Sequence, residues 1–313
     1  MLKYTFKRLA QSALTLAIIL SLVFVLMRQM PIEGYFPNFE KMDEAQIQNG
    51  LQTMGLKDPM LVQLKNFFLR LLHGDLGKSA IYRPNVPITK ILGAKALISL
   101  EMGLLSMALA MMLGLPLGMA MARGKSRFWD KLGTAFIVFV TAVPAAVYYL
   151  LIQLYATDLL KLPMLFRVNK PLSWILPTVS LSLGNIAYYA MWLRRYMVDE
   201  MNKDYVQLAR AKGVPGGAIL RRHVLRNAMV PMVQYLPTSL LYTVAGSIYI
   251  ESLYSVPGMG GLLVDVIQRQ DNPMVQALVL IYSSIGIVGL LLGDLLMGAM
   301  DPRISFVRRE GAR

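Results

Sequence analysis

Few residues of this chain have the types and spacing that chemistry requires. Gly77-Lys78-Ser79 has the ending of a phosphate-binding loop, but such a loop needs a glycine five positions before Gly77, where this chain has Leu72. The two histidines, His73 and His223, are predicted below to lie on opposite sides of a membrane and therefore cannot share a metal ion. The chain has no cysteine, which excludes disulfides and thiol chemistry. We therefore expect no catalytic site, no metal site and no ATP binding through a phosphate loop.

Acidic residues within apolar segments are the next candidates, because a charge inside a membrane is costly and often functional. Glu101 and Glu251 fall within one or two turns of the predicted external boundary, and Asp294 about two turns from the cytoplasmic one. None lies at the midplane beside an opposite charge, as the site of a proton- or sodium-coupled carrier usually does. We expect structural pairing of these acids, with Asp294 the best candidate for a further role.

Polar side chains deep in the apolar segments form a second set of candidates. They are Gln153, Asn185, Tyr188, Tyr189, Gln234, Tyr242 and Tyr249. Each could line a hydrated path through the membrane or form a bond between two helices, and the sequence leaves both roles open.

The elements that position these residues are apolar segments, since 56% of the residues are hydrophobic and only 16% are charged. Six windows are near the ~20 residues that a helix needs to cross ~30 Å of hydrocarbon. They are Leu9–Met27, Ala96–Ala122, Leu132–Ala156, Trp174–Leu193, Ala228–Tyr254 and Met274–Met300. The first follows basic residues as a signal peptide would, but it is long and lacks a small-residue cleavage site, so we expect a retained helix. The sequence predicts an all-α integral membrane protein with six transmembrane helices.

The distribution of basic residues predicts the orientation of these helices. Most lysines and arginines outside the long 31–95 segment lie near the N-terminus, after the second and fourth windows, and in the C-terminal tail. The short opposite loops hold only Lys161, Arg167, Lys170 and Arg269. The positive-inside rule then puts both termini in the cytoplasm. This topology explains the net charge of +14, and nucleic acid is not an expected partner because the basic residues are dispersed.

Three regions follow from this topology. Residues 1–95 comprise one transmembrane helix and a large external segment, residues 96–305 a five-helix core, and residues 306–313 a basic cytoplasmic tail. Within the external segment, Asp58-Pro59 predicts the start of an amphipathic helix and Gly74 its end. We expect that helix to pack on the outer membrane surface or on another subunit.

Small residues and prolines recur in the core helices. The motifs Gly114-x-x-x-Gly118 and Gly289-x-x-x-Gly293 would let neighbouring backbones approach closely. The prolines Pro116, Pro144, Pro231 and Pro237 would each remove a helical hydrogen bond and could kink their helices.

The cytoplasmic insert at about 194–227 is a polar, basic segment between two apolar windows. Its first half predicts a helix ending at Gly213, where glycine can adopt the left-handed conformation, and Pro215 suits the start of a second helix. Leu220 and Val224 would share one face of that second helix, opposite basic side chains. The small residues before the elbow leave room for a close-fitting partner. An alternative is a membrane-surface helix attracted to anionic lipid.

The order of helix, glycine elbow and helix resembles the EAA loop of binding-protein-dependent ABC importer permeases, with Ala209-Arg-Ala-Lys-Gly213 at its centre. Over nearly its whole length the chain is similar to permeases of the oligopeptide/dipeptide/nickel family. The similarity lies in these motifs: Met1-Leu-Lys-Tyr-Thr-Phe-Lys-Arg8, Gly55-Leu-Lys-Asp-Pro59, His73-Gly-Asp-Leu-Gly-Lys-Ser79, Gly114-Leu-Pro-Leu-Gly118, Ile175-Leu-Pro177, Ser255-Val-Pro-Gly-Met-Gly260 and Asp301-Pro-Arg-Ile304.

The resemblance implies a type I importer-like permease fold in a bacterial or archaeal cytoplasmic membrane. The partners it implies are a second homologous permease, two cytoplasmic ATPase subunits that bind ATP and Mg²⁺, an external substrate-binding protein and membrane lipids. This chain would hold no cofactor of its own. The substrates it implies are oligopeptides first, then dipeptides, with nickel and other small solutes after them.

The resemblance also assigns residues. The ATPase-coupling set is Asp204, Leu208, Ala209, Ala211, Gly213, Ile219, Leu220 and Arg222, and the external-loop set is Pro257, Gly258 and Gly260. The chain departs from the family pattern at two places. Asp204 is the nearest acid to the glutamate that usually opens the EAA signature, and Asp271-Asn-Pro273 replaces an aspartate–aromatic–proline run.

A stand-alone secondary carrier or channel is the main alternative function. Inverted repeats, broken midplane helices or a midplane charge pair would favour it, and none is apparent in the sequence. A membrane-embedded enzyme would need a nucleophile or a metal cluster, and neither emerges.

Overall fold

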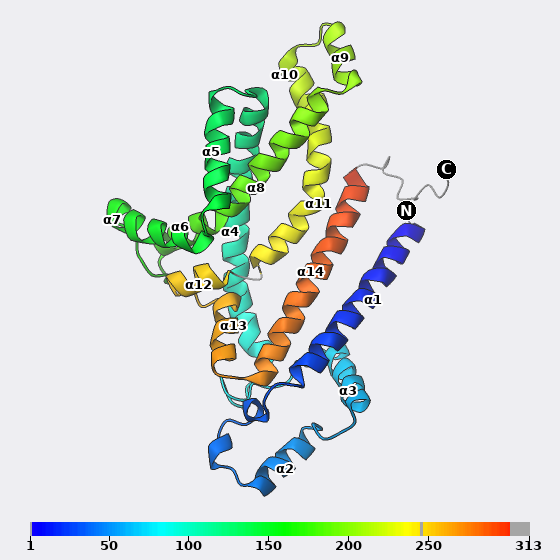
Figure 1. The fold of residues 1–313 in the computed structure, drawn as a ribbon, viewed down its shortest axis with the longest axis vertical. Coiled ribbons are helices and arrows are strands. Elements are labelled where there is room, and N and C mark those ends of the chain that lie inside the picture. Colours follow the sequence, from blue (N-terminus) through cyan, green and yellow to red (C-terminus); the bar gives the residue numbers. More distant parts are fainter. Residues whose placement is uncertain (1, 245–246, 301–313) are drawn as a thin grey trace.

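The computed structural model describes residues 2–244 and 247–300, and regular structure there is helical apart from one isolated β-bridge between Lys78 and Pro87 (Figure 1). The helices are α1 (Leu2–Met27), α2 (Glu44–Thr53), α3 (Met60–Leu72), α4 (Ile88–Arg123), α5 (Phe128–Ala142), α6 (Ala145–Leu151), α7 (Thr157–Leu160), α8 (Ile175–Met201), α9 (Asp204–Ala211), α10 (Gly216–Ile219), α11 (Leu225–Val244), α12 (Ile248–Tyr254), α13 (Met259–Gln268) and α14 (Asn272–Met300). The predicted tail at 306–313 and the 301–304 motif lie outside the described residues.

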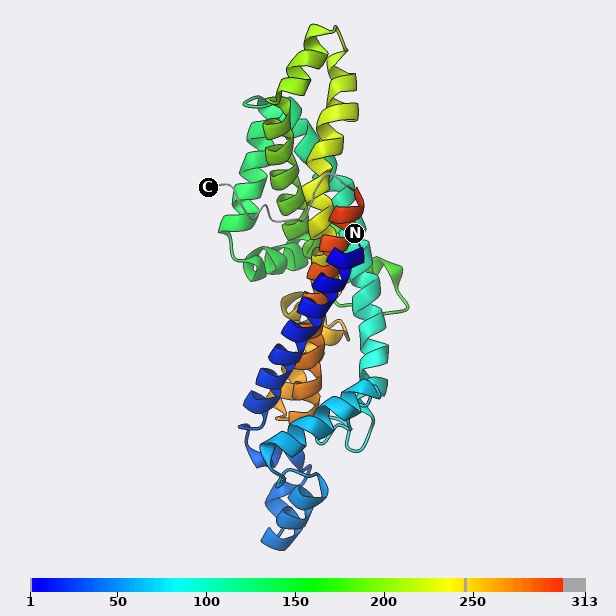
Figure 2. The same cartoon turned by 90° about the vertical axis from the view of Figure 1, so that its right-hand side faces the viewer.

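The molecule is elongated, and its helices run mainly along the long axis. Figure 1 shows the α4–α5 turn and the α9–α10 region at one end, with α2 and α3 at the opposite end. The second view shows α1 crossing in front of α14 (Figure 2), and the two helices are in contact. The basic segments after the second and fourth predicted windows therefore lie at the same end of the molecule.

By length and hydropathy, three described helices can cross a membrane: α1 over Leu9–Met27, α4, and α14 over Asn272–Leu296. Two bent helix pairs raise the number to five if each pair is one span. The remaining predicted windows correspond to α8 and α11, which are continuous helices of 27 and 20 residues with a more polar composition. The division expected at residue 95 falls inside α4, which begins at Ile88.

Two predicted windows are wrong as straight helices. Within 132–156 the chain breaks between α5 and α6 at Pro144, and the segments on either side meet at 108°. Proline has no N–H to donate, so it separates two helices here as expected. Within 228–254, α11 ends at Val244 and a separate α12 follows, bent by 87° from α13.

The most extensive helix–helix packing is between α4 and α8, and it depends on two glycines. A Cβ atom added to Gly114 would lie 2.9 Å from the carbonyl oxygen of Ile186, and one added to Gly118 would lie 2.8 Å from that of Ala190. In the second motif, a Cβ on Gly289 would lie 3.0 Å from Thr238 Cα of α11. The predicted close approach of backbones at both motifs is therefore confirmed.

The segment between α1 and α4, which is predicted to be external, is attached to α1 by aromatic packing. The ring centroids of Phe24 in α1 and Phe67 in α3 are 4.9 Å apart. The predicted end of α3 at Gly74 is confirmed, since this residue has φ +70°. The predicted cap at Asp58 is wrong by one residue, because Pro59 occupies the N-cap position and no side chain caps the helix. Leu72 of α3 remains 82% exposed, so the apolar surface of α3 extends beyond its contact with α1.

A buried carboxylate also holds the external segment. Asp271, which is fully buried, accepts hydrogen bonds from Ser79 Oγ at 2.6 Å and from the backbone N–H groups of Ala80, Ile81 and Tyr82 at 2.8–3.2 Å. It also accepts from the N–H of Met274 in the first turn of α14. The loop after α3 is therefore fixed to the start of α14 by one side chain that is satisfied by N–H and O–H donors.

We expect Gly118→Ala to lower the thermal stability of the protein, because the added methyl group would meet the backbone of α8. Overpacking of this kind costs about 1–3 kcal/mol. The matched control is Gly93→Ala on the same helix, where nothing lies within 4 Å of the new Cβ. Melting temperatures of the purified variants in detergent check the prediction, and equal values for the two variants would contradict it.

Candidate functional site

The insert between α8 and α11 forms a helical hairpin at one end of the molecule (Figures 1 and 2). It consists of α9, the turn at Gly213, α10 and one π-helical turn, Leu220–Val224, that leads directly into α11. The two helices and the elbow predicted from the sequence are present. The π-helical turn was not predicted, because its side-chain pattern over five residues does not differ from that of an α-helix.

The elbow at Gly213 has the geometry of a Schellman motif. The N–H of Gly213 donates to Arg210 O at 2.9 Å, and the N–H of Val214 donates to Ala209 O at 3.1 Å. Gly213 has φ +76°, which a residue with a side chain adopts at a cost. A Cβ atom on Gly213 would have nothing within 4 Å, so the chain itself leaves this surface open.

The inner side of the insert continues the hydrophobic core. Val206, Ile219 and Val224 are at most 3% exposed and pack in one cluster with Leu193 and Met197 of α8. Ile219, which the resemblance assigned to the coupling set, therefore faces the protein interior. This packing joins the insert to the helices before and after it as one unit.

The outer side of the insert is polar, basic and solvent-accessible. Of the coupling set, Asp204, Leu208, Ala211, Gly213 and Arg222 are exposed, while Ala209 and Leu220 are partly buried. Leu208 is 57% exposed. We call the exposed members of the coupling set the outer face of the insert.

Tyr205 fixes the base of the insert by hydrogen bonds to both neighbouring helices. Its hydroxyl donates to the Glu200 carboxylate in α8 and accepts from Asn227 Nδ2 in α11 at 3.0 Å. The pKa of Tyr205 is raised above its ordinary value. The larger cause is partial burial of the phenol, and the second cause is its hydrogen bond with Glu200. Because the phenol therefore remains protonated at neutral pH, it stays a donor to Glu200.

A bidentate ion pair joins α5 to α8 just before the insert. Arg194 Nε donates to Asp130 Oδ1 at 2.5 Å, and Arg194 Nη2 donates to Asp130 Oδ2 at 2.8 Å. Asp130 also accepts from the N–H of Ser126 in the α4–α5 turn. The side chain of Asp130 is 6% exposed and that of Arg194 is 31% exposed. This geometry is the strong form of an arginine–carboxylate contact.

At the external loop, Glu251 organises the chain between α12 and α13. This buried carboxylate accepts from Ser99 Oγ of α4 at 2.9 Å and from the N–H of Gly261 at 2.8 Å. The Ser99 hydroxyl in turn accepts from the N–H of Met259. A Cβ on Gly258 would collide with the Glu251 carboxylate, which explains the glycine at that position.

The other external-loop residues have different surroundings. Gly260 packs against the backbone at the start of α12, since a Cβ there would lie 2.9 Å from the Ile248 nitrogen. Pro257 is exposed at the turn. The loop set therefore contains two packing glycines and one surface proline.

Structural pairing of the three acids is observed for two of them. It is confirmed for Glu251, whose partners are neutral donors, and for Asp294, which accepts from Gln234 Nε2 at 3.1 Å between α11 and α14. Glu101 is exposed on α4, and its carboxylate has no hydrogen bond or ion pair within the described residues. The pairing expected of Glu101 is therefore not found in this chain alone.

Two of the pathway candidates hold the fold together. Gln153 is 2% exposed and donates to Leu253 O at 2.8 Å, and Tyr189 is fully buried with its hydroxyl 2.6 Å from Ser239 Oγ. Their polar groups are satisfied inside the protein.

The remaining pathway candidates are partly or well exposed. Tyr188 stacks on Tyr235 with ring centroids 4.2 Å apart, and Asn185 donates to Thr243 Oγ1 at 3.4 Å. Gln234 is partly buried beside Asp294. Tyr242 and Tyr249 are 58% and 63% exposed. These five side chains thus retain access to a surface of the isolated chain.

The segment around Gly77-Lys78-Ser79 is not a phosphate cradle, because the Ser79 hydroxyl is bonded to Asp271. The histidines are far from a shared site: His73 contacts Leu69 O, and the ring of His223 is 6.5 Å from that of Tyr205. In the part of the chain that the structure describes, no group of three or more His, Asp or Glu residues could hold a metal ion.

Sequence reasoning missed the pairs that join distant segments. Asp130 and Arg194 are 64 positions apart, and Ser79 and Asp271 are 192 apart. An available signal was the position of Asp130 and Arg194 at the boundaries of two apolar windows on the same predicted side of the membrane. No comparable pattern connected Ser79 with Asp271.

The chain is similar to known transport proteins along nearly its whole length. The family model described as "Binding-protein-dependent transport system inner membrane component" matches residues 114–306. A dipeptide transport system permease protein, DppB of Bacillus subtilis (strain 168), is 32% identical over 311 residues, covering 99% of this chain and all of the relative. A glutathione transport system permease protein, GsiC of Pectobacterium atrosepticum, is 32% identical over 98% of this chain and all of its own length.

Two further similarities cover about two thirds of this chain. An oligopeptide transport system permease protein, AmiC of Streptococcus pneumoniae, is 37% identical over 67% of this chain and 42% of its own length. Among solved structures, an inward-facing form of the MetNI methionine ABC transporter matches with a TM-score of 0.57 at 16% identity. That match covers 68% of this chain and 97% of the other, and it supports the fold of the helical core.

We expect Asp130→Asn to lower the melting temperature, because it leaves the half-buried Arg194 without its carboxylate. The loss should be about 2 kcal/mol, between the values typical of exposed and of buried pairs. The matched control is Asp158→Asn, whose 4.0 Å pair with Lys161 is between side chains that are 83% and 94% exposed and should contribute little. Thermal unfolding in detergent measures both, and equal effects would contradict the structural role of the Asp130–Arg194 pair.

Proposed function

Because this chain belongs to the family of binding-protein-dependent transport system inner membrane components, we propose that it forms half of the translocation path of an importer for oligopeptides. The chain is a multi-pass inner-membrane permease of a bacterial ABC importer, and it is not itself catalytic. Such an importer includes a partner permease, ATPases and a binding protein. The proposal adds the substrate, the membrane topology and the residues that couple this chain to its partners.

The observation that carries the substrate proposal is the similarity along the entire chain to permeases named for dipeptide and glutathione transport. The permease named for oligopeptide transport matches two thirds of the chain at higher identity. Dipeptides, glutathione and oligopeptides share amide groups and a free carboxylate. Oligopeptides are the preferred class, followed by dipeptides, with nickel and other small solutes after them.

The proposed topology has six transmembrane segments and both termini in the cytoplasm. The basic turn between α4 and α5 and the basic insert lie at one end of the molecule, which supports a cytoplasmic position for that end (Figure 1). The segment between α1 and α4, with α2 and α3, is then external. Counting the bent pair of α5 and α6–α7 as one span gives six segments together with α1, α4, α8, α11 and α14.

The proposed ATPase contact is the outer face of the insert. The insert of this chain docks on one of two cytoplasmic ATPase subunits, and the insert of the partner permease docks on the other. Those subunits bind ATP and Mg²⁺, and this chain contributes the surface on which they dock. The surface at Gly213 is open, whereas the inner side of the insert packs on α8 and α11. A push on the outer face is therefore transmitted to the membrane helices without deformation of the insert itself.

In the proposed mechanism, ATPase closure biases the permease between two access states. The insert moves with α8, α8 moves with α4 through the glycine contacts, and α5 follows through the Asp130–Arg194 pair. The accessible pathway candidates, which include Tyr188, Tyr242 and Tyr249, would face the path formed with the second permease.

A stand-alone carrier or channel is the second candidate function. It would need a charged site at the midplane, whereas Glu251 and Asp294 accept hydrogen bonds from neutral donors and Glu101 lies within one or two turns of the predicted external boundary. It would also work without ATPases. Substrate uptake by the purified permease alone would favour it.

We expect the complete importer in proteoliposomes, supplied with its binding protein, to hydrolyse ATP faster when an oligopeptide of four to six residues is present. Uptake of the labelled peptide should depend on ATP. Dipeptides and Ni²⁺ serve as comparison ligands in the same assay. If peptides neither bind to the binding protein nor stimulate hydrolysis, the substrate proposal fails while the permease assignment stands.

We expect Gly213→Trp to abolish transport while membrane insertion is retained, since the new side chain itself would extend into open space. Thermal stability should fall only by the about 1–2 kcal/mol that the left-handed conformation at φ +76° costs a residue with a side chain. The matched control is Gly213→Asn, because asparagine tolerates the left-handed conformation and adds less bulk. ATP-driven uptake and co-purification of the ATPases are measured for both variants. Normal uptake by Gly213→Trp would contradict docking at the elbow.

A further inference from the structure

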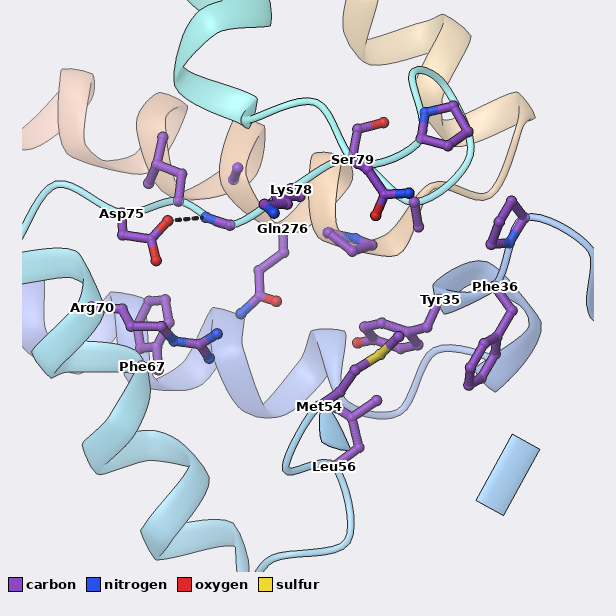
Figure 3. A pocket seen from close by; sticks show the side chains of 18 of the residues that line it. Tyr35, Phe36, Met54, Leu56, Phe67, Arg70, Asp75, Lys78, Ser79 and Gln276 are labelled. Atoms are coloured by element: carbon purple, nitrogen blue, oxygen red, sulfur yellow. Dashed lines mark hydrogen bonds between the residues drawn. The ribbon is translucent and has the colours of Figure 1, made fainter. Parts of the chain in front are cut away.

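A cavity of about 500 Å³ lies where the external segment meets the membrane helices. Its walls come from the end of α1, the 35–37 turn, α3, the 75–85 loop and the first turns of α14. Figure 3 shows Arg70 of α3 and Gln276 of α14 directed into it, with Tyr35 on another wall. It belongs to neither the insert nor the external loop after α12.

The cavity has a strong excess of positive charge. Arg28, Arg70 and Lys78 line it, and Asp75 is its only acidic lining residue. Asp75 already accepts a hydrogen bond from the N–H of Gly77 at 2.8 Å. Within the described residues, no carboxylate lies within 4 Å of any of the three cationic groups. A ligand with negative charge would therefore meet cations that this chain leaves unpaired.

Arg28 is held in place but keeps donors free. Its Nη1 donates to the Tyr35 hydroxyl at 3.0 Å, and its guanidinium carbon lies 4.8 Å from the centre of the Phe24 ring. Its Nε is buried and has no hydrogen-bond partner. A buried guanidinium N–H without a partner is costly unless a ligand or water accepts from it. An oriented arginine with unused donors suits recognition of a phosphate or carboxylate.

An apolar groove on the membrane part of the molecule adjoins the cavity. The groove has a volume of about 220 Å³, and it shares Leu76 and Leu280 with the cavity. Its other walls are Leu20 of α1, Leu71 of α3, Leu241 of α11, and Ile281, Ser284, Ile285 and Val288 of α14. From Leu280 to Val288 the helix rises about 12 Å, close to the ~15 Å depth of one leaflet.

The geometry points to a binding site for an anionic phospholipid. The phosphate headgroup lies in the cavity against Arg28, Arg70 and Lys78, and an acyl chain lies in the groove along α14. The apolar groove is lined mainly by α14, with Leu20 of α1, and both helices can span a membrane, so it is accessible to lipid and inaccessible to a soluble protein. An acidic loop of the binding protein would fit the cavity but would leave the groove unused. The lipid therefore accounts for both parts of the site.

Such a lipid would stabilise the external segment. The cavity joins α3 and the 75–85 loop to α1 and α14, so a bound headgroup would bridge the segment and the membrane helices by charge. It would add to the hydrogen bonds that Asp271 makes to the same loop.

The test uses the complete importer in detergent, with dioleoyl phosphatidylglycerol as the probe and dioleoyl phosphatidylcholine as the neutral comparison. Native mass spectrometry counts bound lipid, and a titration of melting temperature gives its affinity. Headgroup variants are Arg70→Gln and Lys78→Gln, with Lys65→Gln as the matched control, because Lys65 is exposed on α3 outside the cavity. The groove variant is Ile285→Trp, with Leu290→Trp as its control on an exposed face of α14.

The expected result is saturable binding of phosphatidylglycerol in preference to phosphatidylcholine. Each headgroup variant should weaken that binding about fivefold, since a cation near a lipid phosphate contributes about a factor of that size. Ile285→Trp should abolish it, while Lys65→Gln and Leu290→Trp should leave it unchanged. Because Arg70 and Lys78 are exposed and make no ion pair, their variants are expected to fold normally.

Three results would overturn the proposal. Equal binding of the two lipids, or equal losses in Lys65→Gln and Arg70→Gln, would indicate a non-specific lipid shell. Competition by inorganic phosphate as effective as that by the lipid, with no effect of Ile285→Trp, would indicate a free-anion site. A loss of affinity for the binding protein in Arg70→Gln and Lys78→Gln, without any change in lipid binding, would indicate a protein-docking surface.

Discussion

The fold depends on close contact between helix backbones at glycine. In lipid, apolar side chains gain little by moving from the bilayer to a neighbouring helix, so association relies on packing and on bonds between polar groups. Gly118 brings α4 to within van der Waals distance of the α8 backbone, and Gly289 does the same for α14 and α11. These two contacts join four of the long helices in two pairs, α4 with α8 and α11 with α14, and the remaining elements are arranged on them.

Buried carboxylates then position the segments that the glycine contacts leave unattached. Glu251 holds the loop between α12 and α13, Asp271 holds the loop before α4, and Asp130 holds the turn between α4 and α5. Two of the three are satisfied by neutral N–H and O–H donors, and only Asp130 has an arginine partner. A carboxylate with several such donors is stabilised where an unpaired charge would not be tolerated.

Helix α4 connects the two ends of the molecule. Near one end its Gly118 contacts α8, which continues into the insert, and towards the other end its Ser99 bonds both Glu251 and the N–H of Met259. The 19 positions between these residues correspond to about 28 Å of helix. A continuous helix of this length offers a physical route from the insert to the external loop, and its contacts at both ends are specific.

The sequence by itself determined the features that depend on local pattern. Apolar windows indicated membrane helices, the glycine at 213 ended a helix where the left-handed conformation was required, and the two small-residue motifs predicted close packing. Only the tertiary structure decided which distant residues meet. Four features depend on how helices far apart in sequence are arranged. They are the hydrogen bond from Ser79 to Asp271, the ion pair from Arg194 to Asp130, the inward position of Ile219, and the cationic cavity beside an apolar groove. The physical reason is that a backbone turn is fixed by its own few residues, whereas a polar contact or a cavity exists only once packing has brought its walls together.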